Sequence, residues 1–303
     1  MNRAQAPSWV GSLRDHSSQH PIIASALVAS VIFIALLVFE AATGTRQVYS
    51  KYAFIGGTAG FVATAVGTFP ALFIKEIPQK LSDAMLGFAA GMMLAASAFS
   101  LLLPGVEAGT DITGSGFVGG MVVILGMAIG VALMLGLDRF TPHQHMEGGP
   151  CGPGHERYNR AWLFVFAIAL HNFPEGMAIG VGYAQGDFSV GIPLTTAIAL
   201  QDIPEGLAVA LTLRAAGLSP KTSVLIAIAT GILEPIGSLL GVSLAGGYLI
   251  AYPIGLGLAG GAMLFVVSHE VIPETHQSGH QTVATIGLMI GFALMMVLDT
   301  TLG

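Results

Sequence analysis

Apolar residues run along this chain in long blocks that polar residues interrupt only briefly. Windows of about twenty apolar residues recur from end to end, and each, as a helix rising 1.5 Å per residue, crosses a hydrocarbon core of about 30 Å. We therefore predict an all-α fold, a polytopic membrane helix bundle of nine spans. Their ranges are 20–43, 54–74, 82–103, 114–138, 159–184, 190–213, 220–246, 252–275 and 281–302.

The composition agrees with this pattern. Of 303 residues, 53% are hydrophobic and 9% are charged, whereas a soluble chain carries about a quarter charged residues. The 41 glycines fit closely packed membrane helices, as in the pairs Gly87/Gly91 and Gly176/Gly180. The single Cys151 excludes an intrachain disulfide and a Cys-rich metal site. The net charge of −6 gives no polybasic tail, and we expect no nucleic-acid partner.

The basic residues predict an orientation. With nine spans, the side of the N-terminus holds nine of the 11 Lys and Arg residues, and the opposite side holds Arg46 and Lys51. Cytoplasmic loops carry the excess of such residues, so we expect a cytoplasmic N-terminus and a C-terminus outside. The expected organisation is a cytoplasmic segment at 1–19, an additional transmembrane helix at 20–43, and a main membrane domain at 54–302. A His-containing cytoplasmic loop at 139–158 lies within that domain.

Two of the predicted spans carry related polar motifs, LHNFPEG at 170–176 and LQDIPEG at 200–206. A charge at mid-bilayer costs about 2.5–3.5 kcal/mol, so such residues are rare and usually face the bundle interior. Residues at i and i+4 lie on one helix face, which gives each span a polar stripe. The polar residues of these spans and the next are His171, Asn172, Glu175, Gln201, Asp202, Glu205 and Glu234.

Each of these three spans also contains a proline beside a carboxylate. Pro174 and Pro204 have no N–H to bond the carbonyl one turn back, so we expect kinks there. Pro235 follows Glu234 in the same way, and we expect it to free the carbonyl of Gly231. A free carbonyl at this depth must meet a protein group, a water or a cation.

Two interpretations of the polar residues compete. Interhelical hydrogen bonds would hold a bundle together, but several carboxylates in a low dielectric repel one another unless a cation lies among them. One imidazole, amide oxygens and carboxylates without a thiolate suit divalent zinc, iron, manganese or cadmium, whereas calcium and magnesium prefer oxygen alone. Two metal ions bridged by Glu175 and Glu205 fit this number of ligands.

HNFPEG on one span and QDIPEG on the next resemble the signature of the ZIP (Zrt/Irt-like) family of divalent metal transporters. The resemblance runs from about residue 54 to the end and suggests a bacterial member. The helix at 20–43 departs from the eight spans typical of the family. Gln201 also departs from the pattern, because many members have a second His there, and this puts the metal preference in doubt.

The resemblance implies a fold in which the first three and last three core spans form an inverted repeat around the two central motif helices. It implies a binuclear site at mid-membrane and rigid-body movement of one helix group against another. One ion would be held by His171, Glu175, Gln201 and Glu205, and the other by Asn172, Asp202 and Glu234 with the shared glutamates. Met93 is a further candidate ligand, although plain packing also explains it.

Other polar residues are candidates for the transport pathway. His143 and His145 lie in the 139–158 loop, which is equally well a plain linker. The segment SHEVIPE contributes His269 and Glu270, which could receive departing metal or simply reach water. The remaining candidates are Asp138, at the end of the 114–138 span, and Asp299, near the opposite surface.

The sequence thus predicts a transporter that carries divalent transition-metal ions, zinc above all and also cadmium, iron or manganese, into the cytoplasm through a bacterial inner membrane. The metal is substrate, no cofactor is expected, and the protein is not expected to be an enzyme. Membrane lipid is an expected partner, and the family resemblance makes a homodimer plausible. The alternatives are an intramembrane zinc-dependent hydrolase, which has no evident general base here, and an organic-solute carrier, which would require a Lys or Arg among the carboxylates.

Overall fold

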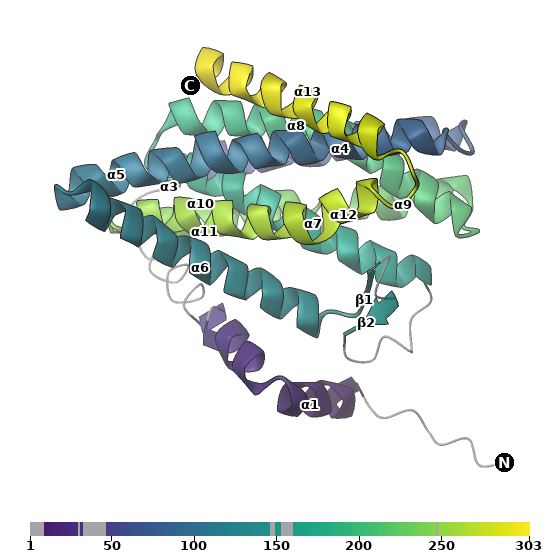
Figure 1. The fold of residues 1–303 in the computed structure, drawn as a ribbon, viewed down its shortest axis with the longest axis horizontal. Helices are drawn as coiled ribbons and strands as arrows, with labels where there is room; N and C mark the ends of the chain where they lie inside the picture. The colour runs from purple at the N-terminus through teal and green to yellow at the C-terminus, as the bar shows by residue number, and fades with distance from the viewer. Residues whose placement is uncertain (1–8, 30, 33–46, 146–148, 153–159, 247) are drawn as a thin grey trace.

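A computed structural model describes the chain except residues 1–8, 30, 33–46, 146–148, 153–159 and 247. The described residues form a bundle of long helices (Figure 1). Its elements are α1 (Trp9–Gln19), α3 (Gln47–Thr68), η1 (Phe69–Leu72), α4 (Gln79–Ala95), η2 (Ala96–Leu102), α5 (Leu103–Thr113), α6 (Gly116–Phe140), β1 (His143–His145), β2 (Gly149–Cys151), α7 (Arg160–Gly182), α8 (Phe188–Ala215), α9 (Pro220–Thr230), α10 (Leu233–Ala245), α11 (Ala251–Val266), η4 (Val267–Val271), α12 (Ile272–Thr275) and α13 (Gln281–Leu302).

The predicted all-α membrane bundle is confirmed. Seven helical stretches of the described residues are long and apolar enough to cross a membrane. They are Tyr49–Leu72, Gln79–Thr113, Gly116–Phe140, Phe188–Ala215, Pro220–Ala245, Ala251–Thr275 and Gln281–Leu302. The motif helix α7, 23 residues long, lies in the same bundle. The predicted span 20–43 falls partly outside the described residues; 21–29 and 31–32 are helical.

The third predicted span is longer than expected. We predicted its end at residue 103, before Pro104, but the helix continues through a π-helical segment, η2, into α5 and ends at Thr113. Proline is tolerated in the first turn of a helix, and Gly114 then ends this one with φ +70°. The exposed Glu107 and Asp111 therefore lie on a helix and not in a loop.

The seventh predicted span is one apolar stretch interrupted by a turn at residues 231–232. Helix α9 ends at Thr230 and α10 begins at Leu233, so Pro235 lies in the first turn of α10, where its missing N–H breaks no bond. The expectation of a free carbonyl at Gly231 is wrong, because the N–H of Glu234 donates to it at 3.1 Å. In contrast, α7 and α8 continue through Pro174 and Pro204.

The main helices fall into two packed groups. We call α3, α7, α8, α9 and α10 the site group, and α4, α5, α6, α11 and α13 the frame group. Within the site group α7 packs along α10 and α3 along α8; within the frame group α13 packs along α4 and α11 along α6 (Figure 1). Small apolar residues and methionines of both groups fill the core between them.

Glycines line three of these helix pairs from both sides. A Cβ on any of them would overlap a backbone carbonyl oxygen of the partner helix or, at Gly237, come within 2.7 Å of one, so only glycine allows this approach. The α4–α13 contact uses Gly87, Gly91, Gly287 and Gly291; α6–α11 uses Gly126, Gly130, Gly257 and Gly261; α7–α10 uses Gly176, Gly180, Gly237 and Gly241. These contacts fix the motif helix α7 against α10, which carries Glu234.

The N-terminal segment and the predicted His loop lie near the end of α6. The His16 ring of α1 meets Phe140 edge-on at 5.3 Å. Leu27, in the helical residues 21–29, lies against Gly136. Both N-terminal helical stretches therefore pack against α6. After α6, the strands β1 and β2 pair antiparallel with His143 opposite Cys151. Part of the expected loop at 139–158 is therefore a short hairpin.

Candidate metal site between the two motif helices

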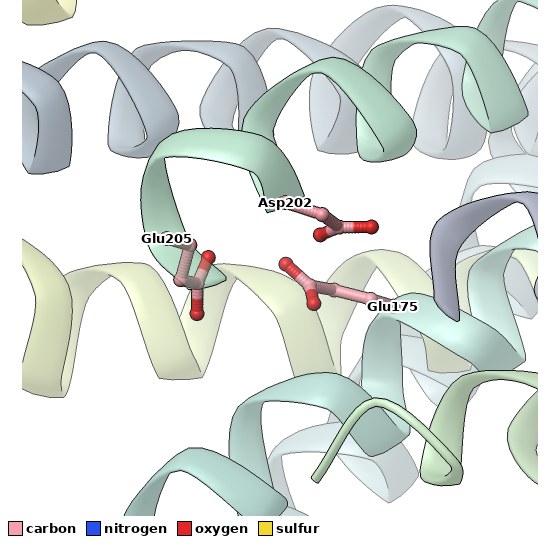
Figure 2. Close-up of side chains that lie close together, drawn as sticks. All are labelled: Glu175, Asp202 and Glu205. Atoms are coloured by element: carbon pink, nitrogen blue, oxygen red, sulfur yellow. The ribbon is translucent and has the colours of Figure 1, made fainter. Parts of the chain in front are cut away.

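Three carboxylates from the two motifs converge. Glu175 on α7 and Asp202 and Glu205 on α8 each offer one oxygen, and these oxygens lie within 4.8 Å of one another. Figure 2 shows Glu175 reaching from α7 toward the two acidic side chains of α8. The helical spacing explains the convergence, since Asp202 and Glu205 are three residues apart and share one face.

Burial makes this arrangement costly without a cation. Glu175, Gln201 and Glu234 have no exposed surface, and Asp202 is 3% exposed. Among the buried side chains of the predicted ligands, four oxygens lack a hydrogen-bond partner: Glu175 Oε2, Gln201 Oε1, Asp202 Oδ2 and Glu234 Oε2. Unpaired buried carboxylate oxygens are strongly unfavourable. Oxygens of this type, gathered together, are what a divalent cation binds.

The amide and the imidazole are oriented by their neighbours. Gln201 donates its Nε2 hydrogen to Glu175 Oε1, which leaves the amide oxygen of Gln201 available. His171 Nδ1 lies 3.0 Å from the carbonyl oxygen of Ala167. Because a carbonyl can only accept, Nδ1 carries the proton, and Nε2 is free to bind a metal ion.

The other predicted ligands are buried on neighbouring helices. Glu234 lies in the first turn of α10, where the helix dipole favours a negative charge, and Asn172 is buried on α7. Met93 is 1% exposed on α4 and belongs to the main apolar core. Its role as a ligand, like that of the other seven residues, stays a prediction.

The candidate pathway residues lie in three places. Glu270 Oε2 is 3.5 Å from His171 Nδ1, and His269 Nε2 is 4.0 Å from Asp138 Oδ2, so these residues extend from the site toward the ends of α6 and α12. Asp299, on α13, accepts a 2.5 Å hydrogen bond from Ser100 Oγ. His143 and His145 lie in β1, and their side chains are outside the described residues.

Two buried polar side chains outside the motifs, Thr64 and Asp83, were not anticipated. Thr64 on α3 donates to Glu234 Oε1 at 2.9 Å. Asp83, 1% exposed, accepts from Gln79 Nε2 at 2.8 Å and lies 2.9 Å from His280 Nδ1. The sequence offered only a weak signal, since a Thr within an apolar helix usually bonds its own backbone.

The fold and this cluster together define an integral membrane protein with a buried, acidic, oxygen-rich site. The profile of the ZIP zinc transporter family matches residues 142–299. Zinc transporter ZIPB of Bordetella bronchiseptica is 57% identical, over 97% of this chain and 96% of that protein. Zinc transporter GufA of Myxococcus xanthus is 41% identical, over 80% and 95%, and human zinc transporter ZIP11 is 30% identical, over 79% and 94%.

The chain therefore belongs to the ZIP family, and the predicted resemblance is confirmed. Its members are transporters and not enzymes, so the hydrolase alternative is not supported.

Proposed function

We propose that this protein carries divalent transition-metal ions, with zinc as the principal substrate, through the site between α7 and α8. The observation that carries the proposal is the set of four unpartnered buried oxygens on Glu175, Gln201, Asp202 and Glu234. Such a set is unfavourable in an apolar bundle and favourable around a divalent cation. The related proteins named as zinc transporters support the same conclusion.

The donor set supports two neighbouring ions. His171, Glu175, Gln201 and Glu205 would hold one, with Met93 as a further ligand, and Asn172, Asp202 and Glu234 would complete the other by sharing the glutamates. One imidazole among oxygen ligands favours zinc and also admits cadmium, iron and manganese.

The direction of transport is inward, across a bacterial inner membrane. Nine of the 11 Lys and Arg residues fall on the side of the N-terminus, which supports a cytoplasmic N-terminus and an outer C-terminus. Asp299 then lies on the entry side, and Asp138, His269 and Glu270 lie on the exit side with the His143–His145 strand. Exposed apolar side chains such as Phe117 and Leu225 support contact with lipid. A homodimer stays a prediction, and the molar mass in detergent tests it.

Zinc uptake by the purified protein in sealed vesicles tests the proposal. Glu175→Gln keeps the shape of the side chain and removes its charge. Since loss of a supporting partner alone weakens metal sites by about 10–100-fold, loss of this ligand should lower uptake by at least about 100-fold. Glu107→Gln, at an exposed position on α5, is the matched control and should transport like the wild type. Wild-type vesicles that accumulate no divalent metal, or a fully active Glu175→Gln, would overturn the proposal.

A further inference from the structure

The helix α3 contributes a wall of the candidate site although it carries none of the predicted ligands. Its residues Gly60 and Thr64 are one turn apart and lie on one face. A Cβ on Gly60 would overlap Glu234 Oε2 and lie 3.1 Å from Asp202 Oδ2. The two unpartnered oxygens of α8 and α10 therefore meet in space that exists because residue 60 has no side chain.

Thr64 fixes one of these two carboxylates. Its hydroxyl donates to Glu234 Oε1 at 2.9 Å, and both side chains are buried. A hydrogen bond to one oxygen stops the carboxylate from rotating, so the second oxygen, Oε2, stays directed at Gly60 and Asp202. The bond also supplies one of the few donors in a region rich in acceptors.

The backbone of Thr64 is itself held in place. A Cβ on Gly206 of α8 would overlap the carbonyl oxygen of Thr64, and one on Gly231, just before α10, would lie 3.2 Å from the Thr64 Cβ. Thr64 of α3 is thus packed against α8 and against the turn between α9 and α10, and these contacts hold its hydroxyl in position.

We propose that Thr64 is a positioning residue that aims the free oxygen of Glu234 at the metal ion shared with Asp202, in the space left open by Gly60. This inference rests on the proposed metal transport and concerns the ion nearer α3 and α10. Thr64 does not itself bind the metal. It acts as the outer partners of metal ligands do, by orienting a ligand and keeping its charge available.

Calorimetric titration of the purified full-length protein with Zn²⁺ alone, and separately with Cd²⁺, tests this role. Thr64→Val keeps the volume and removes the donor, and it should weaken one of the bound ions by about 10–100-fold. Thr64→Ser restores the hydroxyl and should return the affinity to within about threefold of the wild type, given that serine offers the same donor. If Thr64→Val lowered the metal affinity only by disturbing the helix packing, Thr64→Ser would not restore that affinity.

Thr68→Val is the matched control. Thr68 is a buried threonine one turn further along α3, but its hydroxyl donates to the carbonyl of Ala65. The Thr68→Val variant should bind both ions like the wild type. Thermal unfolding in detergent should show whether either Val variant is misfolded.

Gly60→Ala is a second variant that does not depend on the hydrogen bond. It should abolish binding of the same ion, because the added methyl group occupies the place of Glu234 Oε2.

The proposal fails if folded Thr64→Val binds both ions with wild-type affinity, or if Thr68→Val is equally impaired. Vesicle uptake separates this failure from that of the proposed function. A wild type that binds metal and does not transport it refutes the transport proposal alone, whereas normal transport with an unaffected Thr64→Val refutes the role of Thr64 alone.

Discussion

The two motif segments have the same spacing and different surroundings. On α7 the segment is enclosed: Glu175 has no exposed surface, and Leu170 is 8% exposed. On α8 the equivalent Glu205 is partly exposed, and Leu200 and Ile203 are 38% and 41% exposed. A repeated motif therefore does not give two equivalent half-sites. The α7 segment forms a wall enclosed by the bundle, and the α8 segment forms a wall that lies partly at the bundle surface.

The second residues of the two motifs, His171 and Gln201, also make different hydrogen bonds. His171 uses one ring nitrogen to bond the carbonyl one turn back on its own helix. Gln201 instead reaches across to Glu175 on the other motif helix. The amide at 201 thus links the two walls, while the imidazole at 171 bonds within its own helix. The same spacing thus gives one side chain that bonds within its own helix and one that bonds to the neighbouring helix.

The largest expected effect of this asymmetry is on transport. We expect Glu175→Gln to bring zinc uptake to background and Glu205→Gln to lower it by only about tenfold, because water can replace a ligand at a partly exposed position more readily than in a closed one. Initial uptake rates in the same vesicle preparation measure the difference. Equal losses in the two variants would show that the walls are equivalent after all.

The glycine that ends each motif should be equally sensitive in both segments, for different reasons. A Cβ on Gly176 would overlap the backbone of Glu234 on α10, and one on Gly206 the backbone of Thr64 on α3. Overpacking of this kind costs about 1–3 kcal/mol, so Gly176→Ala and Gly206→Ala should both lower the thermal unfolding temperature in detergent.

Gly120 provides the comparison for these two variants. It lies in α6 with nothing within 4 Å of its added Cβ, so Gly120→Ala should hold or raise that temperature, as alanine favours helix by about 1 kcal/mol. If Gly120→Ala lowered the unfolding temperature as much as Gly176→Ala does, overlap with a neighbouring helix would not be the cause of the lower temperature.

The smallest effect is expected at the residue that most distinguishes the motifs. Gln201→His makes the α8 motif resemble the α7 motif and supplies a second imidazole. Imidazole suits zinc better than the harder manganese, so the ratio of zinc to manganese uptake should rise by about threefold to tenfold, on the order of 1 kcal/mol. Competition between the two ions in one uptake assay measures this ratio, and an unchanged ratio would place Gln201 outside the ligand set.

Much of this organisation follows from local patterns. The alternation of apolar blocks and polar motifs predicted the helices, and the i, i+4 spacing placed His171 and Glu175 on one face. What could not be predicted depends on which helices become neighbours. Thr64 and Glu234 are 170 residues apart, and nothing in the local sequence distinguishes Thr64 from Thr68. The end of the third span was also predicted wrongly, because the composition of this stretch does not indicate the π-helical segment.

The glycine contacts of the paired helices limit how this protein can change. At most of these glycines the obstacle to a larger residue is a backbone carbonyl oxygen of the facing helix. Every amino acid carries that oxygen, so no substitution on the facing helix can make room, and no second mutation can compensate for the first. A heavier residue is accepted there only if two whole helices move apart, which would also open the contacts at the other glycines along the pair. Replacement of these glycines is therefore prevented on both helices of each pair.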